Sequence, residues 1–208
     1  MKTVIRFALC LAILAPAPGF AQTEWEVPSL MRPGAPSGLT ILVFSAEDRG
    51  DDLGILAAWR ASDAPAGIGF RLGLSEADRR GPDPDDDDLS VIFGIDFSGT
   101  LASPSSTGSP GVLWWTGAGL GVGDDLLASF PLGISLGWVG SGDGVSFMPY
   151  VGGHIALDLF SGEGDDDLDL EGAIDLGMDL DFGTGFQIRF GAAVGGHDAF
   201  GIGVRFPT

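Results

Sequence analysis

The stretch Leu168–Phe182 reads LDLEGAIDLGMDLDF and alternates almost without a break. One set of alternate positions holds Leu, Ile, Met and Phe, and the other holds Asp and Glu with Ala173 and Gly177. A period of two residues predicts a β-strand with one aliphatic face and one wet, acidic face. Strands of soluble domains average about 5–6 residues, whereas a strand with lipid outside and water inside keeps this pattern for about 9–11. The stretch therefore predicts a membrane-spanning strand.

Further segments repeat the pattern, and no helical periodicity of useful length interrupts them. One of them sets Phe130, Leu132 and Ile134 against Gly133 and Ser135. The first segment is less clear, because both of its faces are apolar. The sequence predicts about ten strands. They span residues 38–47, 53–60, 66–75, 89–100, 111–122, 127–139, 145–158, 168–182, 185–195 and 198–206.

The beginning of the chain is typical of a secretory signal peptide. Residues 1–21 start with Lys2 and Arg6, continue with a short apolar stretch and end on small residues. The apolar stretch is too short for a transmembrane helix. Cys10 is the only cysteine and lies in this segment, so disulfides and thiol chemistry are excluded from the predicted mature chain.

The segment after the signal peptide differs from the rest of the chain. Residues 22–37 carry Pro28, Pro33 and Pro36 and no alternation, which predicts an extended periplasmic lead-in. Residues 38–208 then form a single β-barrel domain, a length that suits one domain.

Charge and composition exclude several classes of partner. The net charge is −19, and residues 1–21 hold two positive charges and no negative ones, so the predicted mature chain reaches −21 with eight Arg and no Lys. That balance argues against nucleic acid and against a polybasic contact with anionic lipid. A mean hydropathy of +0.29 in so charged a chain requires apolar and charged residues to be sharply segregated. Glycine is abundant, at 35 of 208 residues, more than double its usual share of about 7%.

The connections suggest how the strands are oriented. The two acidic connections, Glu76–Asp88 and Ser161–Asp167, both follow odd-numbered predicted strands. An even-stranded barrel with both ends in the periplasm places them outside the cell. Leu101–Pro110, in contrast, is long for a periplasmic turn. The same orientation gathers an aromatic girdle at the periplasmic interface. It consists of Trp59, Phe97, Trp114, Trp138, Phe147, Phe182, Phe186 and Phe206.

These features together resemble the small bacterial outer-membrane β-barrel proteins. The resemblance covers residues 38–206 and the signal peptide, and no motif of a particular member carries it. It implies an antiparallel up-and-down transmembrane barrel of about ten strands, with eight as the alternative, in the outer membrane. It also implies outer-membrane lipid and lipopolysaccharide as surroundings and the barrel-assembly machinery as a partner. Phe200, Ile202, Val204 and Phe206 match the alternating final strand that this machinery reads, although Pro207 and Thr208 extend past the usual aromatic terminus.

The wet face of the strands forms a glycine-rich, acidic lumen in this interpretation. Its charges either pair into a structural polar core or line a cation-favouring passage. The predicted lumen network consists of Arg71, Asp96, His154, Asp158, Asp175, Asp179, Arg189 and Arg205.

Metal binding and catalysis have weak support in the sequence. Carboxylates of the acidic connections are candidate Ca²⁺ or Mg²⁺ ligands, although a self-repelling solvated loop explains them as well. These candidates are Asp85, Asp87, Asp165, Asp166 and Asp167. His197–Asp198 in the last outer loop offers an acid–base pair, but no complete catalytic constellation is recognisable, and no cofactor fingerprint occurs.

The sequence predicts an outer-membrane barrel with a structural or adhesive role or limited passage of small solutes, and it predicts no enzyme. The alternative is a soluble periplasmic or secreted barrel that binds an apolar ligand inside, which would reverse the two faces. A membrane-embedded hydrolase is the third hypothesis.

Overall fold

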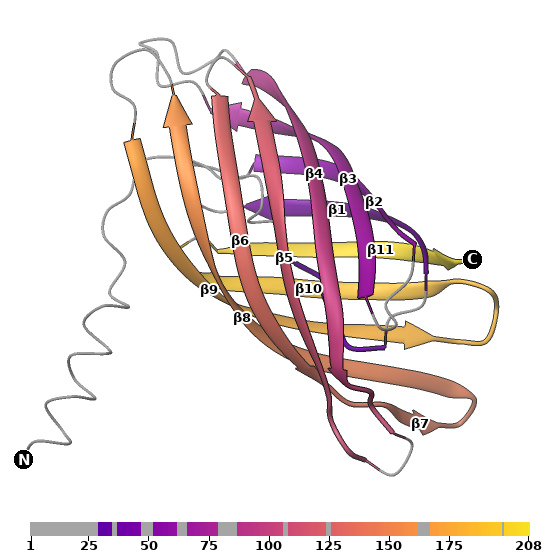
Figure 1. The fold of residues 1–208 in the computed structure, drawn as a ribbon. Coiled ribbons are helices and arrows are strands. Elements are labelled where there is room, and N and C mark those ends of the chain that lie inside the picture. Colours follow the sequence, from indigo (N-terminus) through magenta and orange to yellow (C-terminus); the bar gives the residue numbers. More distant parts are fainter. Residues whose placement is uncertain are drawn as a thin grey trace, which may run out of the picture.

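A computed structural model describes residues 29–34, 37–46, 52–61, 66–78, 87–105, 108–123, 126–161, 167–196 and 198–208. Every regular element in these ranges is a β-strand (Figure 1). None of the described residues forms a helix long and apolar enough to cross a membrane. The strands are β1 Gly38–Ala46, β2 Asp52–Arg60, β3 Ala66–Asp78, β4 Asp87–Ala102, β5 Gly111–Val122, β6 Leu126–Gly137, β7 Gly140–Gly142, β8 Val145–Ser161, β9 Asp167–Asp181, β10 Gln187–Gly195 and β11 Ala199–Pro207.

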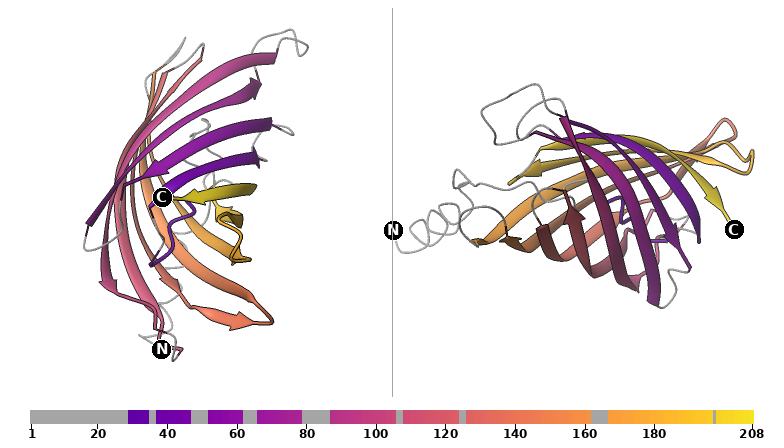
Figure 2. Two further views of the ribbon diagram at one scale, coloured as in Figure 1. Left: turned by 90° about the vertical axis from the view of Figure 1, so that its right-hand side faces the viewer. Right: turned by 90° about the horizontal axis from the view of Figure 1, so that it is seen from above.

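The long strands close into an antiparallel barrel. Each strand from β1 to β5 pairs with the next strand in the chain, as do β8, β9 and β10. The β6–β8 and β1–β11 pairings complete the ring. The strands run side by side and wrap round one axis (Figure 1, Figure 2). The predicted fold class and strand number are confirmed, and the eight-stranded alternative is wrong.

The short strand β7 is absent from the strands that the sequence predicts. It forms a small hairpin with the start of β8, and Asp143 and Gly144 supply the turn with φ of 51° and 82°. Two successive residues with positive φ form the tight turn that matches the twist of a hairpin. The hairpin extends the barrel wall at one rim and takes no part in closure.

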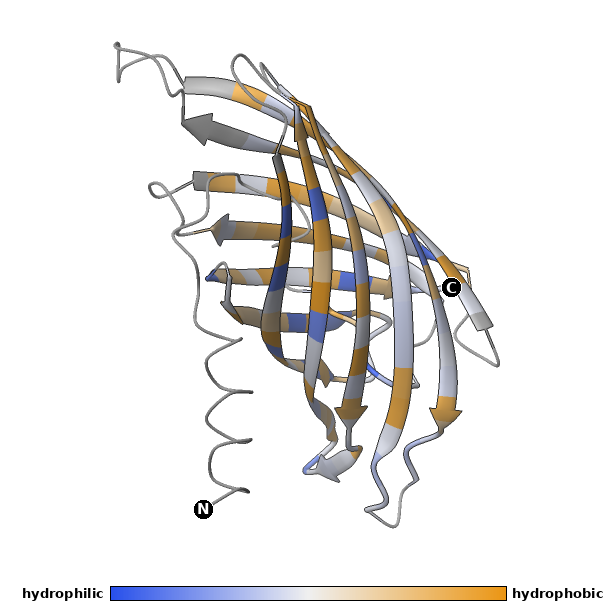
Figure 3. Ribbon diagram, turned by 60° about the vertical axis from the view of Figure 1, so that its left-hand side comes forward, coloured by the Kyte–Doolittle hydropathy of each residue, from blue (hydrophilic) through white to orange (hydrophobic). Residues whose placement is uncertain are grey.

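Burial alternates along strands such as β1, β6 and β10, and the hydropathy of the residues changes repeatedly along the strands (Figure 3). The aliphatic positions of the opening stretch lie outside: Ile174 and Leu176 are 57% and 48% exposed. Their acidic neighbours Asp175 and Asp179 lie inside, at 2% and 0%. Soluble monomers rarely expose a continuous apolar surface on this scale. The soluble barrel with an apolar interior requires the opposite arrangement of faces.

The barrel has two rims, which we name from the first strand. At the β1 rim, β1 begins and β11 ends, and Ser37 and Thr208 are joined by hydrogen bonds from the Thr208 N–H to the Ser37 carbonyl (3.1 Å) and from the Ser37 hydroxyl to the Thr208 carbonyl (2.8 Å). The opposite rim is where β3 ends and β4 begins, and where β8 ends and β9 begins. The two acidic connections therefore follow strands that end at the opposite rim.

Candidate functional site in the barrel lumen

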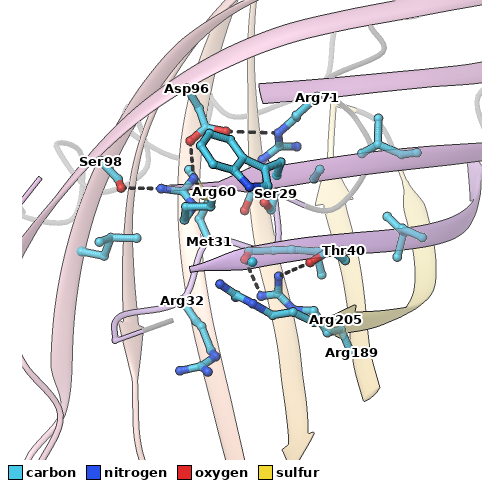
Figure 4. A pocket seen from close by; sticks show the side chains of 17 residues that line it. Ser29, Met31, Arg32, Thr40, Arg60, Arg71, Asp96, Ser98, Arg189 and Arg205 are labelled. Carbon is cyan, nitrogen blue, oxygen red and sulfur yellow. Dashed lines mark hydrogen bonds and ion pairs between the residues drawn. The ribbon is translucent and has the colours of Figure 1, made fainter. Parts of the chain in front are cut away.

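The candidate site is built round a stretch of chain that precedes the barrel wall. Ser29, Leu30, Met31 and Arg32 are all below 9% exposed and lie inside the barrel (Figure 4). We call residues 29–34 the lumen segment. This position differs from the periplasmic location that the sequence predicts for the lead-in. The lumen segment lies in the lumen because wall side chains there form hydrogen bonds with its backbone N–H and carbonyl groups. A short, irregular segment cannot pair these groups within itself. The division of the chain into signal peptide, lead-in and barrel stays a prediction.

Three strands hold the backbone of the lumen segment. The Ser29 N–H donates to Asp175 of β9 at 3.1 Å. Arg71 of β3 donates from Nη2 to the Ser29 carbonyl at 2.8 Å, and Arg189 of β10 donates from Nη2 to the Leu30 carbonyl at 2.7 Å. A buried backbone group without a partner is costly, so these bonds allow an irregular segment to lie inside the barrel.

Asp179 is the acceptor for two arginines at once. Its carboxylate receives Nε of Arg32 at 2.5 Å and Nε of Arg189 at 2.8 Å, and its side chain is fully buried. Arg32 also donates from Nη1 to the carbonyls of Pro33 at 3.3 Å and Gly34 at 3.1 Å. Asp179 thus joins the lumen segment to two neighbouring wall strands.

Asp96 of β4 makes a second such centre. It pairs with Arg60 of β2 and, at 3.5 Å, with Nε of Arg71. Arg60 donates further to the Ser98 hydroxyl at 2.6 Å, and its Nη2 lies 2.8 Å from Sδ of Met31. These contacts bring Arg60 against the lumen segment as well.

The interior also holds apolar contacts with the lumen segment. Leu30 packs in a buried cluster supplied by β1, β2 and β4, and Met31 packs with Leu113 and Trp115 of β5. The β1 strand is apolar on both faces because its inner face covers Leu30. The other members of the Leu30 cluster are Leu42, Phe44, Leu56 and Ile92.

The structure places every residue of the predicted lumen network on the inner face. Besides the two centres described, His154 of β8 pairs with Asp175 through Nδ1 at 2.7 Å, and its ring lies 5.4 Å from that of Trp115. Asp158 is 4% exposed and Arg205 is 2% exposed. Asp175 thus contacts both the wall histidine and the lumen segment.

Sequence reasoning missed two members of this network, Arg32 and Arg60. Arg60 ends β2 on the inward parity of that strand, shared with Leu56. The predicted strand of residues 53–60 already contained it, so this parity was the signal that could have assigned it to the lumen. Arg32 belongs to no alternating segment. Its only signal was a single positive charge in a proline-containing segment of an otherwise acidic chain. Two apolar residues, Leu30 and Met31, precede it, and Pro33 follows it.

The predicted metal and histidine sites stay predictions. Asp85, Asp165, Asp166 and His197 lie outside the described residues, and the side chains of Asp87 and Asp167, which begin β4 and β9, are not described either. Among the residues whose side chains are described, no group of three or more His, Asp or Glu is placed to hold a metal ion. Asp198 accepts the Gly195 N–H at 3.2 Å within its own turn.

The predicted aromatic girdle lies on the outer surface towards the β1 rim. All eight side chains are between 37% and 46% exposed. Trp59 and Phe206 are both paired with Leu39 across neighbouring strands, and the Trp59 ring stacks on Phe70 at 5.8 Å. Phe147 lies opposite Leu180, close to Phe182 at the end of β9.

A cavity of about 40 Å³ lies between the lumen segment and the wall, lined by residues of β1 to β5, β10 and β11. A cavity of this size holds a few water molecules. The long connection after β4 contributes at the rim, since a Cβ at Gly34 would lie 3.2 Å from Pro104. That connection therefore packs on the lumen segment, which explains its length.

No protein-family model matches this chain, and no curated protein matches it either. Among solved structures, it is similar to the β domain of the Bordetella autotransporter BrkA, at 13% identity and a TM-score of 0.48 over 84% of this chain and 100% of that chain. It is also similar to a mutant form of the Rh. blastica porin, at 13% identity and a TM-score of 0.21 over 83% of this chain and 99% of that chain.

Proposed function

We propose that this protein is an integral outer-membrane β-barrel with a structural or adhesive role, whose lumen is closed at rest by its own lumen segment. The observation that carries the proposal is the ion-pair bridge from Arg32 through Asp179 to Arg189, which ties the segment inside an apolar-faced barrel. A freely conducting pore would need this bridge to break.

The membrane location is supported by the surface and the hydrogen bonding of the wall. A closed barrel satisfies the backbone of every strand internally, which spanning structures require. The strands of 9 to 17 residues that form the ring meet the length needed to cross. The aromatic residues near the β1 rim suit a membrane interface. We place this rim in the periplasm, after export by the predicted signal peptide and insertion by the barrel-assembly machinery.

The outward rim would then carry the two acidic connections. We propose that their carboxylates, Asp85, Asp87, Asp165, Asp166 and Asp167 among them, bind Ca²⁺ or Mg²⁺ weakly and bridge to phosphates of lipopolysaccharide. Oxygen-only ligand sets suit these two cations.

Limited passage of small solutes is the second candidate function. It is favoured by the non-covalent attachment of the lumen segment, which is held by hydrogen bonds, ion pairs and side-chain packing. Passage would then depend on the segment leaving the lumen.

One pair of measurements tests the proposal. The chain is expressed with its signal peptide, and outer membranes are run on denaturing gels with and without boiling. We expect a mobility shift in the membrane fraction. A soluble periplasmic protein without a shift would overturn the membrane location.

The purified barrel is then placed in a planar lipid bilayer. We expect no steady current from the natural chain and intermittent openings from Arg32→Ala, whose lumen segment has lost its ion pair. Phe182→Ala, which changes only the outer surface, is the matched control and should stay closed. A steady current from the natural chain would overturn the closed-lumen part of the proposal and favour solute passage.

A further inference from the structure

Arginine side chains gather round the lumen cavity in a chain that is otherwise acidic. Five of the residues that line it are arginines, and a single lining residue, Asp96, is acidic. The five are Arg32, Arg60, Arg71, Arg189 and Arg205, which come from the lumen segment and four wall strands (Figure 4). Asp179 adds a second carboxylate beside them through Arg32 and Arg189. Asp175 adds a third, because it accepts the N–H of Ser29 beside the cavity. Among the described residues, five cations therefore face three anions, which leaves an excess of positive charge at the cavity.

Arg205 stands apart from the other four arginines. It is 2% exposed, and neither its Nε nor its Nη2 has a hydrogen-bond partner in the part of the chain that the structure describes. Buried polar groups are almost always hydrogen-bonded, and buried charges are almost always paired. The guanidinium therefore has two donor nitrogens that no described residue accepts.

The described surroundings of Arg205 supply no carboxylate that is free to pair with it. Its neighbours across the sheet are Thr40 on β1 and Gln187 on β10. Thr40 already accepts Arg189 at 3.4 Å, and the amide nitrogen of Gln187 donates to Asp181 at 3.0 Å. Oε1 of Gln187 is a buried acceptor without a partner among the described residues, but it is uncharged, so the sheet neighbours of Arg205 offer no negative charge. Asp179 and Asp96 are each occupied by two other arginines.

We infer that the cavity at Arg205 is a binding site for one small oxyanion, either a carboxylate or an inorganic phosphate. Two parallel N–H groups of a guanidinium fit two oxygens of such a group, and this bidentate geometry is the reason arginine recognises carboxylate and phosphate. The anion would complete the hydrogen bonds of Arg205 and reduce the excess positive charge. The cavity of about 40 Å³ limits the ligand to a small one. The site goes beyond the proposed function and requires only the folded barrel.

The test measures anion binding to the barrel refolded in detergent micelles. Isothermal titration calorimetry is run with inorganic phosphate and with acetate, at constant ionic strength set by chloride. We expect saturable binding at one site for both ligands in the natural chain. Chloride is spherical and cannot engage the fork in the same way.

The decisive variant is Arg205→Gln, which removes the charge but keeps a polar side chain of similar length. We expect its affinity for phosphate to fall about tenfold or more, as hydrogen bonds to charged groups usually imply. Arg205→Lys keeps the charge without the fork and should fall in between. Asp198→Asn is the control, because it also changes the net charge by one unit but lies in the turn before β11 at the opposite rim, and its affinity should stay within about twofold.

The barrel mobility shift on unboiled gels is measured for every variant, so a folding failure is distinguished from a loss of binding. If Arg205→Gln lacks the shift, Arg205→Lys decides the question. The inference is overturned if the folded natural chain shows no saturable binding, or if a folded Arg205 variant binds phosphate as tightly as the natural chain. Failure of the proposed function would appear separately, as loss of the shift in the natural chain.

Discussion

Replacing Asp179 by Asn tests most directly how the lumen segment is held. The Asp179 carboxylate is fully buried and receives Nε of Arg32 at 2.5 Å and Nε of Arg189 at 2.8 Å. Asparagine keeps the size and one acceptor oxygen but removes the negative charge. Two buried guanidinium groups would therefore lose their carboxylate partner in a single substitution.

The expected loss follows from these two bonds. A hydrogen bond to a charged group contributes about 1.5–3 kcal/mol, so two contribute about 3–6 kcal/mol to the free energy of unfolding. Removing one partner of a buried ion pair costs about 3–5 kcal/mol. Arg32 retains its bonds to the carbonyls of Pro33 and Gly34, which reduces the loss. We therefore expect D179N to lower the free energy of unfolding by about 3 kcal/mol.

The assay is urea unfolding of the barrel in lipid vesicles, followed by tryptophan fluorescence and by mobility on unboiled gels. Asp181→Asn is the charge-matched control on the same face of the same strand. Asp181 accepts the Gly183 N–H at 2.8 Å and the Gln187 amide at 3.0 Å near the rim, so its loss should be about 1 kcal/mol. If D179N lowers stability no more than D181N does, the bridge to the lumen segment contributes nothing, and the reasoning is refuted.

Two further predictions concern the wall. Ile174 faces outward at the middle of β9, and Ile174→Arg should lower the free energy of unfolding in vesicles by about 2–4 kcal/mol. Phe182→Arg, near the rim, should lower it by about 0–1 kcal/mol. Equal losses for the two variants in urea unfolding would contradict the lipid-facing surface. Gly177→Ala should lower stability by about 1–3 kcal/mol because the new Cβ would overlap the Tyr150 ring. Gly142→Ala, where a Cβ meets no atom within 4 Å, should change urea unfolding by less than about 0.5 kcal/mol, and similar losses for both glycines would argue against that packing.

The wall of the barrel could be predicted because its signal is local. Alternation in a strand depends only on residues two apart, and the stretch predicted as 168–182 forms β9 at Asp167–Asp181. Side-chain direction follows from the same parity, so Asp175, Asp179, Arg189 and Arg205 could be assigned to the lumen without knowledge of their partners. Antiparallel neighbours in sequence order then define the ring.

The lumen segment could not be predicted, because everything that holds it is distant in sequence. Its bonds to Asp175, Asp179 and Arg189 join residues separated by 146 to 159 positions. A short segment without periodicity does not indicate which distant residues it will contact. The inner face of β1 was ambiguous for the same reason, since Leu42 and Phe44 are buried only because Leu30 lies against them.

The placement of charge inside the barrel is more specific than the fold requires. A wall with one wet face needs only small or polar inner residues, and much of the inner face of β5 and β6 is glycine and serine. Buried ion pairs are weak evidence for stability, because desolvation offsets their attraction. The arginines of β2, β3 and β10 nevertheless converge with Asp96 and Asp179 where residues 29–32 lie. Their position is explained by the backbone and the arginine that they hold. Arg205 differs from these arginines, because its Nε and Nη2 have no acceptor among the described residues.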